Sequence, residues 1–228
     1  MTEIVRLDRS GEDTALERCA AALEAGDLAV LPTDTVYGLA SRADAPAAVA
    51  SVFAAKGRDS AKSLVVMVGD AREALRLAVP EDRASLGRLA ALWPGPLTVV
   101  VRAVDIPWRE YLAPGTDTLG IRVPAHAFLL RLLPRSGPLA VTSANLSGRD
   151  APRSFAEIDP VLLERVAIAL DAGECGSGTP STVVEIRGSE YALLRRGEIG
   201  EDIISALLRG EGPAAAERDA GTEERKGF

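Results

Sequence analysis

The chain has 228 residues, of which 47% are hydrophobic and 26% are charged. This composition is typical of one large or two small globular domains, and it excludes a disordered chain. The net charge of −7 argues against a broad basic face that coats long nucleic acid, although it permits a small basic pocket for one nucleotide.

Several common kinds of protein are excluded by what the sequence lacks. The two cysteines, Cys19 and Cys175, lie far apart, which is typical of a reducing compartment. The charged N-terminus carries no signal-peptide core, and no run approaches 18 apolar residues, so we expect a cytoplasmic protein without a membrane partner. The single histidine, His126, cannot build a His-rich zinc site, and we expect it to be structural. No P-loop, G-x-G-x-x-G or G-x-S-x-G motif occurs.

Helical periodicity alternates with short apolar runs along the first half of the chain. The pattern predicts a helix at 13–25, a strand at 28–31, a helix at 47–55, a strand at 63–68, a helix capped by Asp70 with Glu73, a helix at 82–92, a turn at 93–96 and a strand at 97–102. This alternation is typical of α/β proteins with a mostly buried sheet.

The second half continues with more strands and fewer helices. It predicts a strand at 119–123, a helix around 128–133, strands at 139–142, 166–170, 182–186 and 191–194, and a closing helix at 200–209. Because several late strands follow one another without helices, we expect a mixed sheet. We expect one domain over 1–210 and a disordered charged tail over 211–228.

Five polar or glycine-containing clusters adjoin the predicted strands, where open α/β sheets usually bind ligands. They are Pro32–Gly38, Lys56–Arg58 with Lys62 and Ser63, Thr116–Thr118 with Arg122, Thr142–Gly148, and Gly173–Thr182. Each has a structural alternative. The first and fourth could close turns, the second could end a solvated helix, and the last could be a flexible loop.

Arg122 is the most informative single residue, because it lies inside an apolar strand. An unpaired buried guanidinium is costly, so Arg122 has either a functional or a structural anionic partner. Together the clusters offer cations, hydroxyls and an amide without a strong nucleophile–base pair. Such a set suits phosphoryl or nucleotidyl transfer, which needs positive charge, positioning and a metal ion.

The same segments carry a resemblance to a known family. They read, in order, LPTDTVYGLA from Leu31, AKGR from Ala55, SLVVMV from Ser63, LWPGPLTVVV from Leu92, IRVPAH from Ile121, TSANLSG from Thr142, PSTVVEI from Pro180 and LRRG from Leu194. The chain resembles the YrdC-like family over residues 13 to 209. The resemblance implies a YrdC-like catalytic domain with a twisted, open, mixed sheet and flanking helices around a deep, positively lined cavity.

The resemblance also implies an activity and its substrates. The family joins L-threonine, bicarbonate or CO2 and ATP, which is expected with Mg²⁺, into L-threonylcarbamoyladenylate and releases pyrophosphate. That product supplies downstream proteins that transfer the threonylcarbamoyl group to adenosine in tRNA. Direct contact of this chain with tRNA stays open.

Family roles can be assigned to individual residues of this sequence. The resemblance implies that L-threonine binds to Thr35, Arg122 and Ser181. It implies catalytic cations at Lys56 and Arg58, and ATP contacts from Lys56, Arg58, Lys62, Thr118, Ser143, Asn145 and Arg195. It implies no protein side chain as a metal ligand.

Two positions depart from the family pattern, and alternative functions remain. Lys62-Ser63 replaces an Asn-Pro, and Met67 stands where some relatives have a histidine near the threonine. One alternative is a paralogue that acts on another carbamoyl compound, which the absence of cysteine clusters disfavours. Another is a non-catalytic RNA-binding module, which the net charge of −7 disfavours. A structural or docking role would leave Arg122 unexplained.

Overall fold

The computed structural model describes residues 1–7 and 11–211 of the chain. Among these residues, ten strands form one mixed sheet in the order β1-β8-β2-β3-β7-β4-β6-β5-β9-β10. The strands are β1 (Glu3–Arg6), β2 (Ala29–Leu31), β3 (Gly38–Arg42), β4 (Val65–Met67), β5 (Leu97–Arg102), β6 (Thr118–Arg122), β7 (Leu139–Ser143), β8 (Ile168–Asp171), β9 (Thr182–Arg187) and β10 (Glu190–Arg195). The predicted mixed α/β sheet is therefore confirmed.

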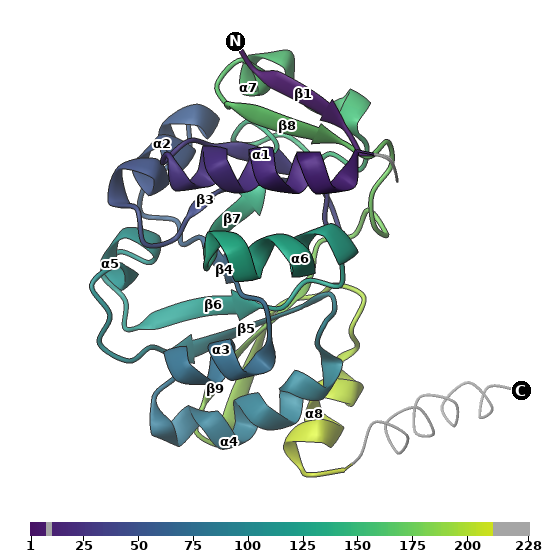
Figure 1. Ribbon diagram of the computed structural model, residues 1–228. Helices are drawn as coiled ribbons and strands as arrows, with labels where there is room; N and C mark the ends of the chain where they lie inside the picture. The colour runs from purple at the N-terminus through teal and green to yellow at the C-terminus, as the bar shows by residue number, and fades with distance from the viewer. Residues whose placement is uncertain (8–10, 212–228) are drawn as a thin grey trace, which may run out of the picture.

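Helices flank both faces of this sheet (Figure 1). They are α1 (Glu12–Glu24), α2 (Pro46–Lys56), α3 (Ala71–Leu77), α4 (Pro80–Leu89), α5 (Arg109–Leu112), α6 (Ala127–Ser136), α7 (Pro160–Leu163) and α8 (Glu201–Leu208), with 3-10 turns η1 (Ala90–Leu92) and η2 (Phe155–Glu157). None of the helices in the described ranges is long and apolar enough to cross a membrane. The predicted tail lies outside these ranges except for Glu211.

Two apolar clusters hold the helices to the sheet. The smaller one packs α1 and α6 on one face of β2, β3, β7 and β8, and the two helices lie side by side across the sheet in Figure 1. The larger one joins α2, α4 and α8 to the opposite face and continues under β5, β6 and β9. Each fully buried leucine or valine contributes about 1.5–3 kcal/mol to this packing.

Side chains alternate between the two faces of the sheet along β6, and this places Arg122 on the face that α1 and α6 cover. Leu119 and Ile121 point into the larger cluster, so Gly120 and Arg122 point to the opposite face. The helices α1 and α6 pack over the neighbouring strands on that face, where Met67 and Val141 belong to the smaller cluster. A cavity forms beside them, and Arg122, Met67 and Val141 all line it.

Two strands escaped the sequence analysis. Gly38–Arg42 was predicted to begin in a polar loop, yet it forms β3 and pairs antiparallel with both β2 and β7. Glu3–Arg6 forms the edge strand β1, parallel to β8. The first contains glycine, alanine and serine, and the second begins and ends with a charged residue, so both have a weak intrinsic preference for strand. Pairing with neighbouring strands, more than this local preference, makes them strands.

The capping residue Asp70 was predicted correctly. Its Oδ1 atom accepts a hydrogen bond from the amide of Glu73 at 2.8 Å, and Glu73 Oε2 accepts one from the amide of Gly69 at 2.9 Å. The first turn of α3 therefore has reciprocal side-chain caps, as the sequence pattern indicates.

A buried carboxylate anchors the hairpin of β9 and β10. Asp82 of α4 is fully buried and accepts hydrogen bonds from the amides of Arg102 at 2.9 Å and Gly188 at 2.7 Å. Its Oδ1 atom also pairs with Arg102 Nη2 at 2.5 Å. Burial raises the pKa of Asp82, but the hydrogen bonds from Arg102 and Gly188 outweigh it and hold the pKa below its ordinary value. The anchor therefore ties the turn between β9 and β10 to α4 and β5.

We expect Asp82→Asn to lower the melting temperature by about 5 °C at pH 7, because an amide cannot accept these charge-assisted bonds. The lowered pKa means that Asp82 stabilises the fold above its unfolded pKa and loses this contribution as the pH falls below about 4. Thermal melts of both proteins between pH 3 and pH 7 should therefore converge at the acid end. A difference that does not vary with pH would contradict the role of the charge.

Candidate functional site

The cavity has a volume of about 250 Å³ and is lined by strand ends and by the loops between them. Six of the ten residues predicted for the site line it: Thr35, Arg58, Arg122, Ser143, Ser181 and Arg195. Three of the six are arginines, so the predicted positive lining is present. These residues lie up to 160 positions apart in the sequence (195 − 35), and only the sheet order brings them together.

Arg122 is fixed at the end of β6 by three groups. Its Nε donates a hydrogen bond to the carbonyl oxygen of Gly95 at 3.1 Å, and its Nη1 donates one to Thr35 Oγ1 at 3.0 Å. Its Nη2 forms an ion pair with Asp34 Oδ1 at 2.7 Å. Arg122 is only 3% exposed, and its Nη2 makes no hydrogen bond. The guanidinium is therefore held in one orientation by these contacts, and Arg122 lines the cavity.

Thr35 is held in place by its own loop. Thr33 Oγ1 accepts hydrogen bonds from the amides of Thr35 at 3.0 Å and Val36 at 3.2 Å, and it donates to the carbonyl of Val36 at 2.7 Å. Both threonines are 2% exposed. The segment therefore forms the turn that was its structural alternative, and the Thr35 hydroxyl still accepts a hydrogen bond from Arg122.

A second hydroxyl network lies on the other side of the cavity. Ser181 Oγ lies 2.8 Å from Thr98 Oγ1 and accepts a hydrogen bond from Arg195 Nη2 at 3.0 Å. Arg195 Nε also donates to the carbonyl of Ser181 at 3.0 Å. Partial burial and the charge of Arg122 lower the pKa of Arg195. Two guanidinium groups therefore act on the same region of the cavity.

Lys56 is the last residue of α2 and lies next to the cavity without lining it. It is 3% exposed, and its Nζ donates to the carbonyl of Ser143 and to Asn145 Oδ1, the latter at 3.2 Å. Burial, reinforced by the charge of Arg58, lowers the pKa of Lys56 to about 8. Ser143 Oγ also donates to Asn145 Oδ1 at 2.5 Å. Lys56 and Asn145 thus contact the cavity residue Ser143 without lining the cavity themselves.

The remaining predicted residues differ in their placement. Arg58 lines the cavity, where its Nη2 donates to the carbonyl of Ser63 at 3.0 Å and its buried Nε has no hydrogen bond. Lys62 is exposed and does not line the cavity. Thr118 begins β6, at the opposite end from Arg122, and its hydroxyl donates to Thr116 Oγ1 at 3.3 Å. The two residues share a sheet face because they lie four positions apart.

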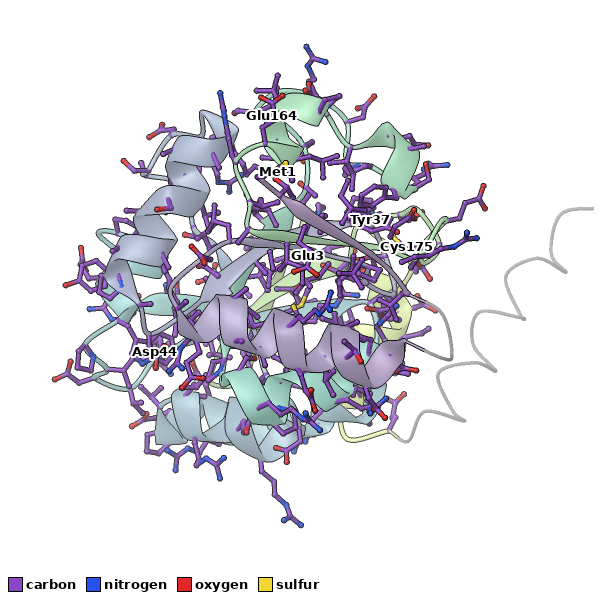
Figure 2. The ribbon with its side chains drawn as sticks, turned by 45° about the horizontal axis from the view of Figure 1, so that its top comes forward. Met1, Glu3, Tyr37, Asp44, Glu164 and Cys175 are labelled. Carbon is purple, nitrogen blue, oxygen red and sulfur yellow. The ribbon has the colours of Figure 1, made fainter. Side chains whose placement is uncertain are left out.

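The predicted Gly173–Gly178 loop packs against the loop that carries Asp34 and Thr35. The amide of Gly178 donates to the carbonyl of Thr35 at 2.9 Å, and the hydroxyl of Tyr37 donates to the carbonyl of Gly173 at 3.0 Å. Figure 2 shows Tyr37 beside Cys175, within this contact. Burial is the main cause that raises the pKa of Tyr37 to about 12. The loop therefore braces one wall of the cavity.

We expect Gly176→Ala to weaken L-threonine binding by about tenfold. A Cβ at Gly176 would lie 2.3 Å from the carbonyl carbon of Asp34, so the loop or the Asp34 segment must move. Gly173→Ala is the matched control, because Gly173 has a similar positive φ of 71° but nothing within 4 Å of the added Cβ. Calorimetric titration with L-threonine measures the difference, and equal losses in both variants would contradict a contact effect.

His126 lies at the N-terminal cap of α6. Its Nδ1 atom is buried without a hydrogen bond, and burial lowers the pKa of the imidazole although Asp34 and Glu12 oppose this shift. It does not line the cavity.

Sequence reasoning missed Asp34 and Thr98 as members of the site. Asp34 belongs to the candidate cluster Pro32–Gly38, for which a turn was the structural alternative, but it was given no role of its own. Thr98 lies in an otherwise apolar strand, and its polarity at a buried position was the available signal.

These features define an α/β protein with a cavity lined by arginines and hydroxyls, a lining whose chemistry suits small anionic ligands. The model of the Sua5/YciO/YrdC family, described as "Telomere recombination", matches residues 21–197. The chain therefore belongs to the Sua5/YciO/YrdC family, which confirms the resemblance noted from its motifs.

Individual relatives agree with this assignment. The chain is 37% identical over 202 residues to the Homo sapiens protein named threonylcarbamoyl-AMP synthase, covering 83% of this chain and 70% of the relative. It is 32% identical over 218 residues to the protein of that name in Bacillus subtilis (strain 168), covering 95% of this chain and 62% of the relative.

Solved structures show the same fold. The crystal structure of P. abyssi Sua5 complexed with L-threonine is similar with a TM-score of 0.81 and 31% identity, covering 93% of this chain. This chain spans only 62% of that longer protein. The crystal structure of E. coli YciO has a TM-score of 0.75 at 22% identity and covers 88% of this chain and 97% of its own, which shows the fold alone.

Proposed function

We propose that this chain is a threonylcarbamoyl-AMP synthase. It joins L-threonine, CO2 or bicarbonate, and ATP into L-threonylcarbamoyladenylate and releases pyrophosphate. The observation that carries the proposal is the fixed Arg122–Thr35 pair in an arginine-lined cavity. It gains support from relatives named for this activity and from the similar Sua5 structure that holds L-threonine.

The amino acid is placed by the Arg122 side of the cavity. Its carboxylate pairs with the guanidinium of Arg122, and hydroxyls of Thr35 and Ser181 lie on the same cavity lining. A charge-assisted contact with an arginine that is already held in one orientation favours one position of the carboxylate. The α-amine, once neutral, attacks CO2 and loses a proton, which gives the carbamate.

The nucleotide is placed by the Arg58 and Ser143 side. A carbamate oxygen attacks the α-phosphorus of ATP in line, the bond to the β-phosphate oxygen breaks, and pyrophosphate leaves. Arg58 and Lys56 stabilise the negative charge on the phosphates, and Arg195, Asn145, Lys62 and Thr118 are further proposed ATP contacts. Mg²⁺ enters as part of the MgATP substrate. No covalent intermediate with the protein is required.

The product, L-threonylcarbamoyladenylate, is a reactive mixed anhydride. We propose that downstream transfer proteins use it to modify adenosine in tRNA, so that tRNA need not bind this cavity itself.

Pyrophosphate release from ATP tests the proposed function. Purified protein is assayed with L-threonine and bicarbonate each present or omitted. Release that requires both supports the synthase. Release that needs another amino acid, or none, would instead indicate a paralogue that acts on another carbamoyl compound. RNA binding tighter than micromolar without ATP turnover would indicate a binding module.

A further inference from the structure

We propose that Asp34 balances the charge of the amino-acid subsite, so that the cavity accepts a zwitterionic α-amino acid in preference to a carboxylate without an ammonium group. Asp34 acts through Arg122 and through its own field, and is therefore a positioning residue. This inference rests on the proposed function, because it takes the carboxylate of L-threonine to bind Arg122.

The geometry places the Asp34 charge directly against Arg122. Oδ1 of Asp34 lies 2.7 Å from Nη2 of Arg122, and the two side chains are 11% and 4% exposed. Both carboxylate oxygens are buried and make no hydrogen bond within the described chain. Because the carboxylate lacks hydrogen-bond partners, its electrostatic interaction with Arg122 is its main compensation for burial.

The carboxylate also lies behind the cavity rather than in it. Asp34 does not line the cavity, whereas its neighbours Thr33 and Thr35 do. Gly176 lies against the Asp34 backbone, because a Cβ there would come within 2.4 Å of the Asp34 carbonyl oxygen. A ligand in the cavity therefore interacts with the charge of Asp34 electrostatically, without direct contact with the carboxylate oxygens.

The charged side chains that line the cavity are all positive. Arg58 and Arg195 line the same cavity, and in the part of the chain that the structure describes no carboxylate lies within ion-pair distance of either. Arg122 also lowers the pKa of Arg195 through their like charges. Asp34 thus offsets one of three guanidinium charges where the amino acid would bind.

This offset has opposite consequences for two kinds of ligand. L-threonine brings an ammonium group, which an uncompensated cluster of arginines repels. A plain carboxylate brings only negative charge, which the same cluster attracts. At an effective dielectric near 20, one unit charge within about 12 Å changes the affinity of a charged group by tenfold or more, and burial limits screening by salt.

The test compares L-threonine with (R)-3-hydroxybutanoate, which is the same molecule without its amino group. Calorimetric titrations measure both dissociation constants for the wild-type protein and for Asp34→Asn, which keeps the shape of the side chain and removes its charge. We expect Asp34→Asn to weaken L-threonine by about tenfold while (R)-3-hydroxybutanoate binds equally or more tightly. The preference for the amino acid should therefore fall by at least about tenfold.

Asp82→Asn is the matched control, because Asp82 is also a buried acid paired with an arginine but lies outside the cavity lining. It should lower the melting temperature and leave the preference unchanged. Asp34→Glu keeps the charge and should retain the preference. If Asp34→Asn does not fold, Asp34→Ser provides the neutral variant.

The outcomes separate the inference from the function on which it rests. Equal weakening of both ligands in the neutral variant, with wild-type binding of L-threonine intact, would show a merely structural role and overturn the inference alone. No change in either ligand would also overturn it. Failure of the wild-type protein to bind L-threonine would overturn the proposed function, and the inference with it.

Discussion

Replacing Arg122 with alanine is expected to reduce kcat/KM for L-threonine by about 10²- to 10³-fold, while the KM for ATP changes less than about threefold. Arg122 is pre-oriented by Gly95 and Thr35, and its Nη2 has no hydrogen bond. Removing one partner of a buried, charge-assisted contact costs about 3–4 kcal/mol, which corresponds to this loss. Steady-state pyrophosphate release, with each substrate varied in turn, measures both constants.

Part of this loss could come from destabilising the protein, because alanine leaves Asp34 buried without its cation. Arg102→Ala is the matched control, since it similarly leaves the buried Asp82 without its arginine, on the neighbouring strand β5. It should reduce stability and leave the KM for L-threonine near the wild-type value. Equal increases in the L-threonine and ATP constants in Arg122→Ala would contradict the assignment of Arg122 to the amino acid.

Arg122 also shows how far the sequence could predict this site. An arginine within the apolar run 119–123 indicates a specific partner, and that prediction required no structure. Its neighbours Thr35 and Gly95 could not be deduced from local patterns, because they lie 87 and 27 positions away. Strand order brings them together, and strand order depends on β3, which the periodicity did not reveal.

The predicted strands and helices succeeded where one face is apolar. The run 97–102 became β5 with the predicted bounds, because its valines alternate between the larger cluster and the cavity face. The strand Gly38–Arg42 was missed because glycine, alanine and serine have little intrinsic preference for strand. In the structure, pairing with β2 and β7 on its two sides compensates for this weak preference. Thr118 lies on the same sheet face as Arg122 but at the opposite end of β6, four residues away along the strand.

Replacing the buried cation Lys56 is expected to have the second large effect on pyrophosphate release. Lys56→Met should reduce pyrophosphate release by at least about 10²-fold at pH 7, because a buried cation near the phosphates is worth several kcal/mol at low effective dielectric. Lys62→Met is the comparison, since Lys62 is exposed, whereas Lys56 is 3% exposed and donates to the cavity residue Ser143. We expect a loss below about tenfold for Lys62→Met. A loss in Lys62→Met as large as that in Lys56→Met would contradict this ranking of the two lysines.

The pH dependence of the wild-type protein follows from the same residue. Burial lowers the pKa of Lys56 to about 8, so the free protein holds a charged amine below pH 8 and a neutral one above it. Phosphate binding favours the charged form, so kcat/KM for ATP should fall as the pH rises through about 8. ATP binding at pH 8.5 should take up part of a proton, which titrations in buffers of different ionisation enthalpy detect. Lys56→Arg keeps its charge throughout this range, so a fall near pH 8 that persists in this variant would assign the titration to another group.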